Sequence, residues 1–324
     1  MTASSGILFA LATTLSWSIC VFPFTEAAKR LGANPLNHFR LLLASVLIMA
    51  LAILSDPIGF RLLFTEDRLH AWLWLGFSGI LGLTIGDHFG FGMYTILGAR
   101  LGSVLTTFAP GAALAVGMVL TGDRLSLIGL FGMVITITGV ITISLSRKER
   151  NAIPESRHGS LAKGVIFGLL AAFCQGAGLV LAKRGMSTGD LDVTDISAIQ
   201  ATFIRLSAAT FSLFVITTLR RDWSNILRPI AHNQEKGIFP AIMGTFFGPV
   251  IGVSLSLATV ARLDASVAQT IFSLVPVVVL VLAVVFRKEP LRVGSLLGVL
   301  VAVSGVLILV WRDLLHQIVI GLIR

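Results

Sequence analysis

Residues 237–261 read GIFPAIMGTFFGPVIGVSLSLATVA, a stretch without Asp, Glu, Lys or Arg. A helix needs about 20 predominantly apolar residues to cross the hydrocarbon core of a bilayer. Small residues recur in this stretch at every fourth position, at Gly244, Gly248, Gly252 and Ser256. Residues four apart lie on one face of a helix, where missing side chains let another helix approach closely. The stretch therefore predicts a transmembrane helix that packs tightly along one face.

The rest of the chain has the same apolar character. Of its 324 residues, 55% are hydrophobic and 13% are charged, and the mean hydropathy is +0.92. Soluble domains carry about 25% charged residues, which excludes a soluble enzyme, a disordered chain and a nucleic-acid-binding protein despite the net charge of +9. We therefore predict an all-α membrane protein with ten transmembrane helices. The predicted spans are 6–25, 36–55, 71–97, 101–122, 125–146, 164–182, 196–219, 237–261, 265–286 and 293–311.

The chain also contains an internal repeat. The pairs aligned by a shift of 166 positions include Gly82 with Gly248, Gly86 with Gly252, Pro110 with Pro276, Asp123 with Glu289 and Gly139 with Gly305. A shift of 165 aligns Arg40 with Arg205, and a shift of 154 aligns Cys20 with Cys174.

Five predicted spans precede the polar segment between the two halves, and five follow it. An odd number of crossings inserts the second half in the opposite orientation. The sequence therefore predicts two inverted five-helix repeats, at 6–146 and 161–311, with a polar linker at 147–160 and a C-terminal tail at 312–324.

These features resemble a known family of transporters. Pro110 and Pro276 lie midway along the fourth and ninth spans, and an acidic turn with Asp123 or Glu289 ends each of them. Together with the two five-helix halves, this pattern resembles the EamA family of the drug/metabolite transporter superfamily over residues 6–311. Asp123 stands where the family pattern usually has Glu. The resemblance implies a carrier of amino acids, their derivatives or other small metabolites, often working outward, and not an enzyme.

Charge and resemblance disagree about orientation. The side of the membrane with both termini would carry 8 Lys and Arg residues, and the opposite side would carry 15. The positive-inside rule places the more basic side in the cytoplasm and both termini outside, whereas the resemblance implies that both termini are inside. The orientation stays open at this point.

Asp87 is the most informative residue for function, because it lies near the middle of the span 71–97. An ionised carboxylate costs about 2.5–3.5 kcal/mol at the centre of a membrane helix. A wet cavity, a cationic partner or a bound proton would retain it. With the adjacent His88 it could accept and release protons in a carrier. Alternatively, Asp87 caps a helix broken near Gly86 or pairs with an arginine such as Arg40 or Arg205.

Other polar and aromatic residues near mid-depth complete the predicted pocket. It combines apolar walls with few polar groups, as small-molecule sites do, and consists of Trp17, Asp87, His88, Tyr94, Gln175 and Gln269. The glycines and prolines of the repeat are predicted packing or hinge positions, because broken helices near the midplane form transporter sites. They are Gly82, Gly86, Pro110, Gly248, Gly252 and Pro276. For Arg40 and Arg205 we favour side chains that extend to the membrane surface over an anion-binding clamp.

The sequence predicts a secondary carrier that moves a small molecule across the cytoplasmic membrane by alternating access, driven by protons. It contains no motif for ATP, for a metal or for hydrolytic catalysis, so we expect no cofactor. The bilayer, the substrate and protons are the expected partners. The second hypothesis is a translocator of lipids or lipid-linked metabolites with the same fold. The third is an intramembrane enzyme that uses Asp87 and His88.

Overall fold

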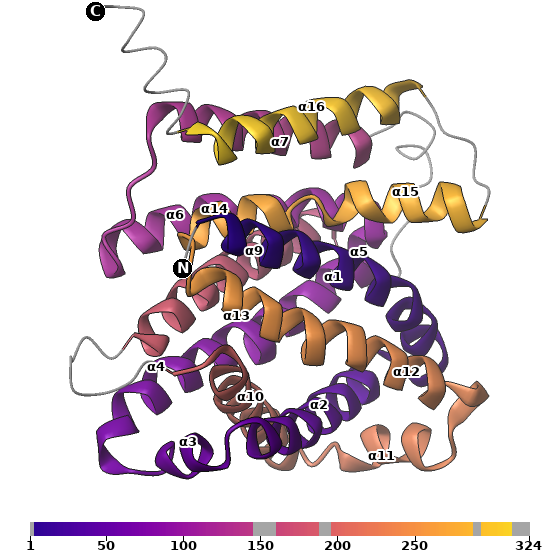
Figure 1. Cartoon of the computed structure of the whole chain (residues 1–324). Coiled ribbons are helices and arrows are strands. Elements are labelled where there is room, and N and C mark those ends of the chain that lie inside the picture. Colours follow the sequence, from indigo (N-terminus) through magenta and orange to yellow (C-terminus); the bar gives the residue numbers. More distant parts are fainter. Residues whose placement is uncertain (1–2, 145–159, 188–195, 288–292, 313–324) are drawn as a thin grey trace, which may run out of the picture. The chain divides into compact units, whose positions relative to one another are not determined.

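A computed structural model describes residues 3–144, 160–187, 196–287 and 293–312, whose regular structure is helical throughout (Figure 1). Most of the predicted linker and tail, together with Glu289, lies outside the described residues. Seven helices in the described part are long and apolar enough to cross a membrane. Three shorter apolar helices lie at Ala109–Leu120, Leu127–Thr142 and Leu296–Val310. The chain is therefore an all-helical membrane protein, and the count of ten spans stays a prediction.

The helices form two compact units, and each unit draws on both sequence repeats. Unit 1 consists of Met1–Ile85 and Gly178–Arg262, and unit 2 of Gly86–Ala177 and Leu263–Arg324. Unit 1 contains α1 (Ala3–Leu31), α2 (Ala33–Ser55), α3 (Pro57–Leu62), η1 (Glu66–Arg68), α4 (Leu69–Gly79), η2 (Ile80–Ile85), α10 (Ala198–Arg220), α11 (Trp223–Ala231), η3 (Gln234–Lys236), α12 (Ile238–Thr245), η4 (Phe246–Val253) and α13 (Ser254–Val260). Unit 2 contains α5 (Gly86–Thr106), α6 (Ala109–Leu120), α7 (Leu127–Ser144), α14 (Ala265–Phe272), α15 (Val275–Arg287) and α16 (Val293–Val310). The helix α9 (Leu161–Met186) contributes to both.

Hydroxyl side chains inside these apolar helices bond to their own backbone. Thr14 donates to the carbonyl of Ala10, Ser18 to that of Thr14, and Thr245 to that of Ala241, at 2.6–2.9 Å. Because lipid offers no hydrogen-bond partners, polar groups in a spanning helix must be satisfied within the protein.

In unit 1, α2 packs against α10, its counterpart in the second repeat. The imidazole Nε2 of His38 lies 2.6 Å from Thr217 Oγ1, and Ser45 Oγ lies 2.9 Å from Thr210 Oγ1. As the residue number rises on α2, it falls on α10, so the two helices run antiparallel. Ser45 and Thr210 are also equivalent under the shift of 165, which places this hydrogen bond where the two repeats meet.

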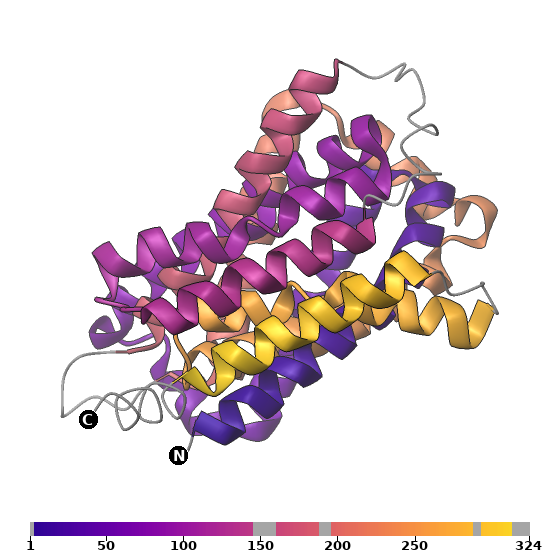
Figure 2. The same ribbon diagram turned by 90° about the horizontal axis from the view of Figure 1, so that it is seen from above.

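In unit 2, α7 packs in the same way against its counterpart α16, which lies beside it in Figure 1 and is yellow in the view from above (Figure 2). A Cβ on Gly139 would overlap the backbone of Ala302, and a Cβ on Gly305 would overlap that of Thr136. Under the shift of 166, Gly139 is equivalent to Gly305 and Thr136 to Ala302. The contact is therefore reciprocal, as at a two-fold axis, and the helices are antiparallel.

One predicted boundary is wrong. The loop expected near residues 98–100, between the third and fourth spans, is helical, and α5 continues to Thr106 before the chain breaks at Thr107 and Phe108. In the second repeat the equivalent chain turns at residues 261–264, and α14 then starts separately. The sequence prediction placed the loop beside Arg100 because a charge interrupts the apolar pattern there, but no helix-breaking proline accompanies it.

Candidate functional site

Among the described residues each repeat has one π-helix, and the two occupy equivalent positions in unit 1. They are η2 (Ile80–Ile85) and η4 (Phe246–Val253), and the shift of 166 aligns Ile80 with Phe246. π-helices are rare and occur frequently at functional sites, because the wider turn leaves the regular backbone ladder. The small-residue ladder predicted from the sequence runs through η4. Its equivalents in the first repeat, which run through η2, are Ser78, Gly82, Gly86 and Gly90. Sequence reasoning missed the π-turns, since Pro249 in η4 has no proline counterpart in η2.

Aromatic side chains fill the small-residue face of η4. A Cβ on Gly252 would overlap the indole of Trp17, and a Cβ on Gly244 would overlap the ring of Phe24. Gly248 faces the same Phe24 ring, at 2.8 Å from the added Cβ to Cε2. Ser16 Oγ donates a hydrogen bond of 2.6 Å to the carbonyl of Phe247, inside the π-helix. The structure therefore brings the predicted residues Trp17 and Gly252 together and ties α1 to the widened turn.

The corresponding face of η2 meets backbone instead of aromatic rings. Ser78, which precedes η2, donates from Oγ to the carbonyl oxygen of Gly178. A Cβ added to Gly178 would lie 3.3 Å from the Cα of Gly82. The glycine pair thus allows the close backbone approach that small residues permit in membranes.

A buried polar cluster lies on the other side of η2, against α10. The hydroxyls of Thr84 and Ser212 lie 3.1 and 3.0 Å from the carbonyl oxygen of Ala209, and 2.8 Å from each other. Thr84 is 3% exposed. This cluster offers hydroxyl groups and a backbone carbonyl beside a π-turn within a membrane helix, the kind of donor and acceptor set that orients a small polar ligand.

Asp87 and His88 are the second and third residues of α5 in unit 2, after Gly86, which follows η2 directly. Asp87 is half-buried and His88 is exposed, and adjacent residues on a helix point about 100° apart. The His88 ring contacts Phe89 at a centroid distance of 5.7 Å. Their role in proton transfer stays a prediction.

Two other predicted site residues meet in unit 2. Gln269 on α14 is 4% exposed, and its Nε2 donates to the backbone carbonyl of Gln175 on α9 at 3.3 Å. The side chain of Gln175 itself is exposed. Tyr94 lies on α5, but its side chain is outside the described residues. Trp17 belongs to unit 1 and not to unit 2.

The two predicted proline breaks coincide with helix starts. Pro110 is the second residue of α6 and Pro276 the second residue of α15. Each follows a turn at equivalent positions, at Thr107 and Phe108 and at Ser273 and Leu274. Proline suits the first turn of a helix because the missing N–H has no intrahelical partner there. Their role as hinges stays a prediction.

Arg205 departs from the predicted extension to the membrane surface, and Arg40 contacts side chains of its own unit. Arg205 is 5% exposed inside unit 1, so its guanidinium does not extend to a surface. The Arg40 guanidinium lies 5.6 Å above the Phe24 ring, and its Nε donates to Asn37 Oδ1. His38 is buried against Thr217, whereas Glu26 is half-exposed and bridges to Arg30.

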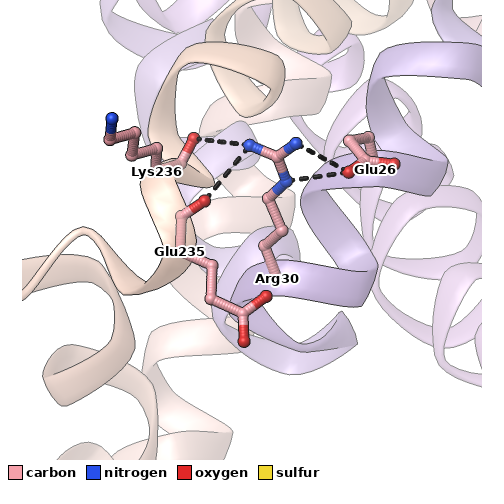
Figure 3. A network of polar contacts seen from close by, with 4 residues as sticks. All are labelled: Glu26, Arg30, Glu235 and Lys236. Carbon is pink, nitrogen blue, oxygen red and sulfur yellow. Dashed lines mark hydrogen bonds and ion pairs between the residues drawn. The ribbon is translucent and has the colours of Figure 1, made fainter.

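Arg30 also fastens the end of α1 to the loop before α12 (Figure 3). Its Nη1 donates to the carbonyl oxygens of Glu235 and Lys236 at 3.1 and 3.4 Å, and its Nη2 lies 2.7 Å from the Glu26 carboxylate. Glu235 and Lys236 adopt φ of 50° and 59°, and this left-handed backbone turns both carbonyls toward the guanidinium. Within the described residues, no group of three His, Cys, Asp or Glu side chains is placed to hold a metal ion.

Comparison with known proteins assigns the family. The EamA-like transporter family matches residues 4–145 and 162–311, which together make up most of the chain. The chain belongs to the EamA-like transporter family. The two matched segments are the two repeats, so this family member has an internal two-repeat architecture and is a multi-pass membrane protein of a transporter family. The sequence-based resemblance is thereby confirmed.

A solved structure has the same fold. One crystal structure of a protein is similar to this chain with a TM-score of 0.70 and 14% sequence identity. The similarity covers 94% of this chain and 96% of the chain in the crystal structure. None of the curated proteins matches the chain. The likeness to the crystal structure concerns the fold, and the EamA family assignment rests on the two matched repeats.

Proposed function

We propose that this EamA-family protein is a secondary carrier of ten transmembrane helices that moves a small, amino-acid-like metabolite across the cytoplasmic membrane by alternating access. Two five-helix repeats inserted in opposite orientations would exchange conformations and thereby expose the substrate first on one side and then on the other. The antiparallel pairing of equivalent helices carries this proposal. If the two repeats were inserted in the same orientation, α2 would run parallel to α10 and α7 parallel to α16.

The π-helices are the proposed moving elements. A π-turn pairs residues five apart where an α-helix pairs residues four apart, so a shift between π and α geometry would change the helix register. In η2 the turn lies between the Ser78–Gly178 contact and the Thr84–Ser212–Ala209 cluster. A substrate that hydrogen-bonds to this cluster would bias the register of η2, and Asp87 lies two residues after the end of η2.

The proton-coupling step is assigned to Asp87 and His88. Asp87 is half-buried within the continuous helix Glu66–Met93. An ionised carboxylate costs free energy inside the membrane, and a bound proton would remove that cost. The exposed neighbour His88 can deliver and remove the proton.

The test is transport by purified protein in liposomes with an imposed pH gradient, using radiolabelled amino acids as the first panel and nucleosides and sugar phosphates as the next. We expect accumulation against a concentration gradient that vanishes in Asp87→Asn, with exchange at equal concentrations retained. Asp56→Asn is the matched control, because asparagine can also accept the Gly59 N–H bond that caps α3. Accumulation that survives Asp87→Asn would refute the coupling role, and the absence of transport by the wild type for every panel member would count against the carrier itself.

A further inference from the structure

An open apolar groove of about 390 Å³ runs along the last turns of α10 and the start of α11 in unit 1. Its lining consists of Phe211, Phe214, Val215, Thr218, Leu219 and Trp223. Phe211 and Leu219 are 72% and 79% exposed, so the groove faces outward from the unit. A groove with such walls on a membrane protein has the chemistry to hold a hydrocarbon chain.

The back wall of the groove is held in place by its neighbours. The rings of Phe214 and Trp223 are perpendicular at a centroid distance of 5.1 Å, and His38 stacks on Phe214 from α2. The indole Nε1 of Trp223 donates to Thr218 Oγ1 at 3.0 Å. With the indole anchored at both its ring and its N–H, the groove is preformed and does not need a ligand to open it.

Cationic residues mark one end of the groove. α10 ends with Arg220, and Arg221 and the α11 residue Arg228 follow within eight positions; all three are exposed. The nearby acid Asp222 accepts a 2.6 Å hydrogen bond from Asn225 Nδ2 and so is directed along α11.

The backbone at Arg221 adds an independent observation. Arg221 has φ of 53°, at the position after a helix where glycine is the usual residue. The chain therefore keeps a cationic side chain at a position where the backbone conformation favours glycine. Glycine would fit this conformation better, so replacing Arg221 with glycine removes the charge without straining the backbone.

The short helix α11 is held against the unit and presents mixed side chains outward. Its Ile226 is 2% exposed and packs toward α2, whereas Ser224, Asn225 and Arg228 are exposed. Leu227 adds an apolar side chain that is 53% exposed. Exposed apolar and cationic side chains on one helix suit the boundary between acyl chains and headgroups.

We propose that this surface binds an anionic phospholipid of the surrounding bilayer, with one acyl chain in the α10–α11 groove and the phosphate at Arg220 and Arg221. The groove supplies the apolar half of the recognition and the two arginines the charged half. Each Lys or Arg near an anionic membrane surface strengthens binding roughly fivefold, so the pair distinguishes an anionic headgroup from a zwitterionic one. The proposal depends on membrane insertion alone and not on the identity of the transported substrate.

Thermal unfolding of the purified protein in neutral detergent tests the proposal, with phosphatidylglycerol and phosphatidylcholine of identical acyl chains as probes. We expect phosphatidylglycerol to raise Tm at a concentration at least tenfold below that needed for phosphatidylcholine. Equal responses to the two lipids would overturn the proposal. An equal rise in Tm with inorganic phosphate alone would also overturn it, since the site would then recognise a free anion.

Variants separate lipid binding from folding. Arg221→Gly should raise Tm in neutral detergent, because glycine suits φ of 53°, and yet weaken the response to phosphatidylglycerol about fivefold. Arg220→Gln combined with Arg221→Gly should weaken it roughly thirtyfold. Arg124→Gln, which removes an exposed arginine from another loop, is the control and should leave the response unchanged. A full response in the double variant would refute the role of the arginines.

A second variant tests the groove itself. Val215 lies in the groove and is 41% exposed, so Val215→Phe should fill the space with little strain. We expect this variant to need several-fold more of either lipid for the same Tm rise. An unchanged response to both lipids would show that no acyl chain occupies the groove and would overturn the proposal.

Discussion

The two π-helices show how a repeated backbone can carry different packing. Around η4, Trp17 and Phe24 cover the small-residue face with aromatic rings. Under the shift of 154 their counterparts in the second repeat are Ala171 and Gly178, and around η2 the contact is a hydrogen bond from Ser78 and a close backbone approach. The π-turn is common to both regions although the side chains around it are not. We therefore associate the π-turn itself with the proposed transport. The side chains packed against it would set how stable each π-turn is.

The largest effect should come from closing the space around η4. Gly252→Val places branched carbons where the Trp17 indole lies and 3.0 Å from the Phe247 carbonyl oxygen, counted from the added Cβ. Overpacking of this kind costs about 1–3 kcal/mol or more, measured as a loss of thermal stability in detergent. Gly111→Val is the matched control, because nothing lies within 4 Å of a Cβ added there. If Trp17→Ala does not restore stability to Gly252→Val, the indole is not the obstacle.

Removal of the aromatic filling should have the next largest effect. Phe24 is half-buried against Gly244 and Gly248, and full burial of a phenylalanine is associated with losses of about 3–5 kcal/mol on truncation. Phe24→Ala should therefore destabilise the protein by about 2 kcal/mol and make the η4 contact resemble that of η2. Phe239→Ala, at a site that is 69% exposed, should change stability little. Similar losses in the two variants would remove the distinction between the regions.

A smaller loss is expected on the η2 side. Ser78→Ala removes the hydrogen bond to the Gly178 carbonyl from a fully buried position. Interhelical hydrogen bonds in membranes contribute about 0.6–1.7 kcal/mol, so unfolding in a mild denaturant should shift by that amount. The control is Ser304→Ala, whose hydroxyl bonds within its own helix on an exposed face. A loss larger than that of Phe24→Ala would reverse the proposed order of the two contacts.

The smallest effect should come from the network in Figure 3, which reinforces only the η4 side. Arg30→Gln breaks the bridge to Glu26 and the bonds to the loop carbonyls. Because the two side chains are 32% and 45% exposed, solvent screens the pair, and exposed pairs contribute about 0.2–1 kcal/mol. The effect should shrink further in high salt. Lys29→Gln, one residue earlier and exposed, provides the control, and a loss insensitive to salt would contradict this account.

The sequence predicted that several site residues lie in helices, but it did not predict which residues of other helices they contact. Spacing of four predicted the small-residue faces, and the structure shows which side chains meet them: Trp17 at Gly252 and Gly178 at Gly82. The side chain of Gln269 on α14 contacts the carbonyl of Gln175 on α9, and these two residues are 94 positions apart in the chain. No local pattern predicts such a pair.

For Arg205 the sequence-based prediction was wrong. Its distance from the end of the span suggested a side chain that reaches the membrane surface, but 5% exposure places it inside unit 1. Sequence position gives the depth of a residue in a helix and not the direction that its side chain takes. That direction depends on how neighbouring helices pack.

Membrane class, helical structure and the two-repeat organisation were determined by the sequence alone, because the bilayer imposes them through local properties. An apolar segment in lipid has to satisfy its backbone hydrogen bonds internally, so each such segment becomes a helix whatever its neighbours are. Only the tertiary structure decided where the helices widen into π-turns, which aromatic rings fill the small-residue faces and which helices share a compact unit. These features depend on close packing between segments far apart in the chain, where a single methyl group changes the outcome.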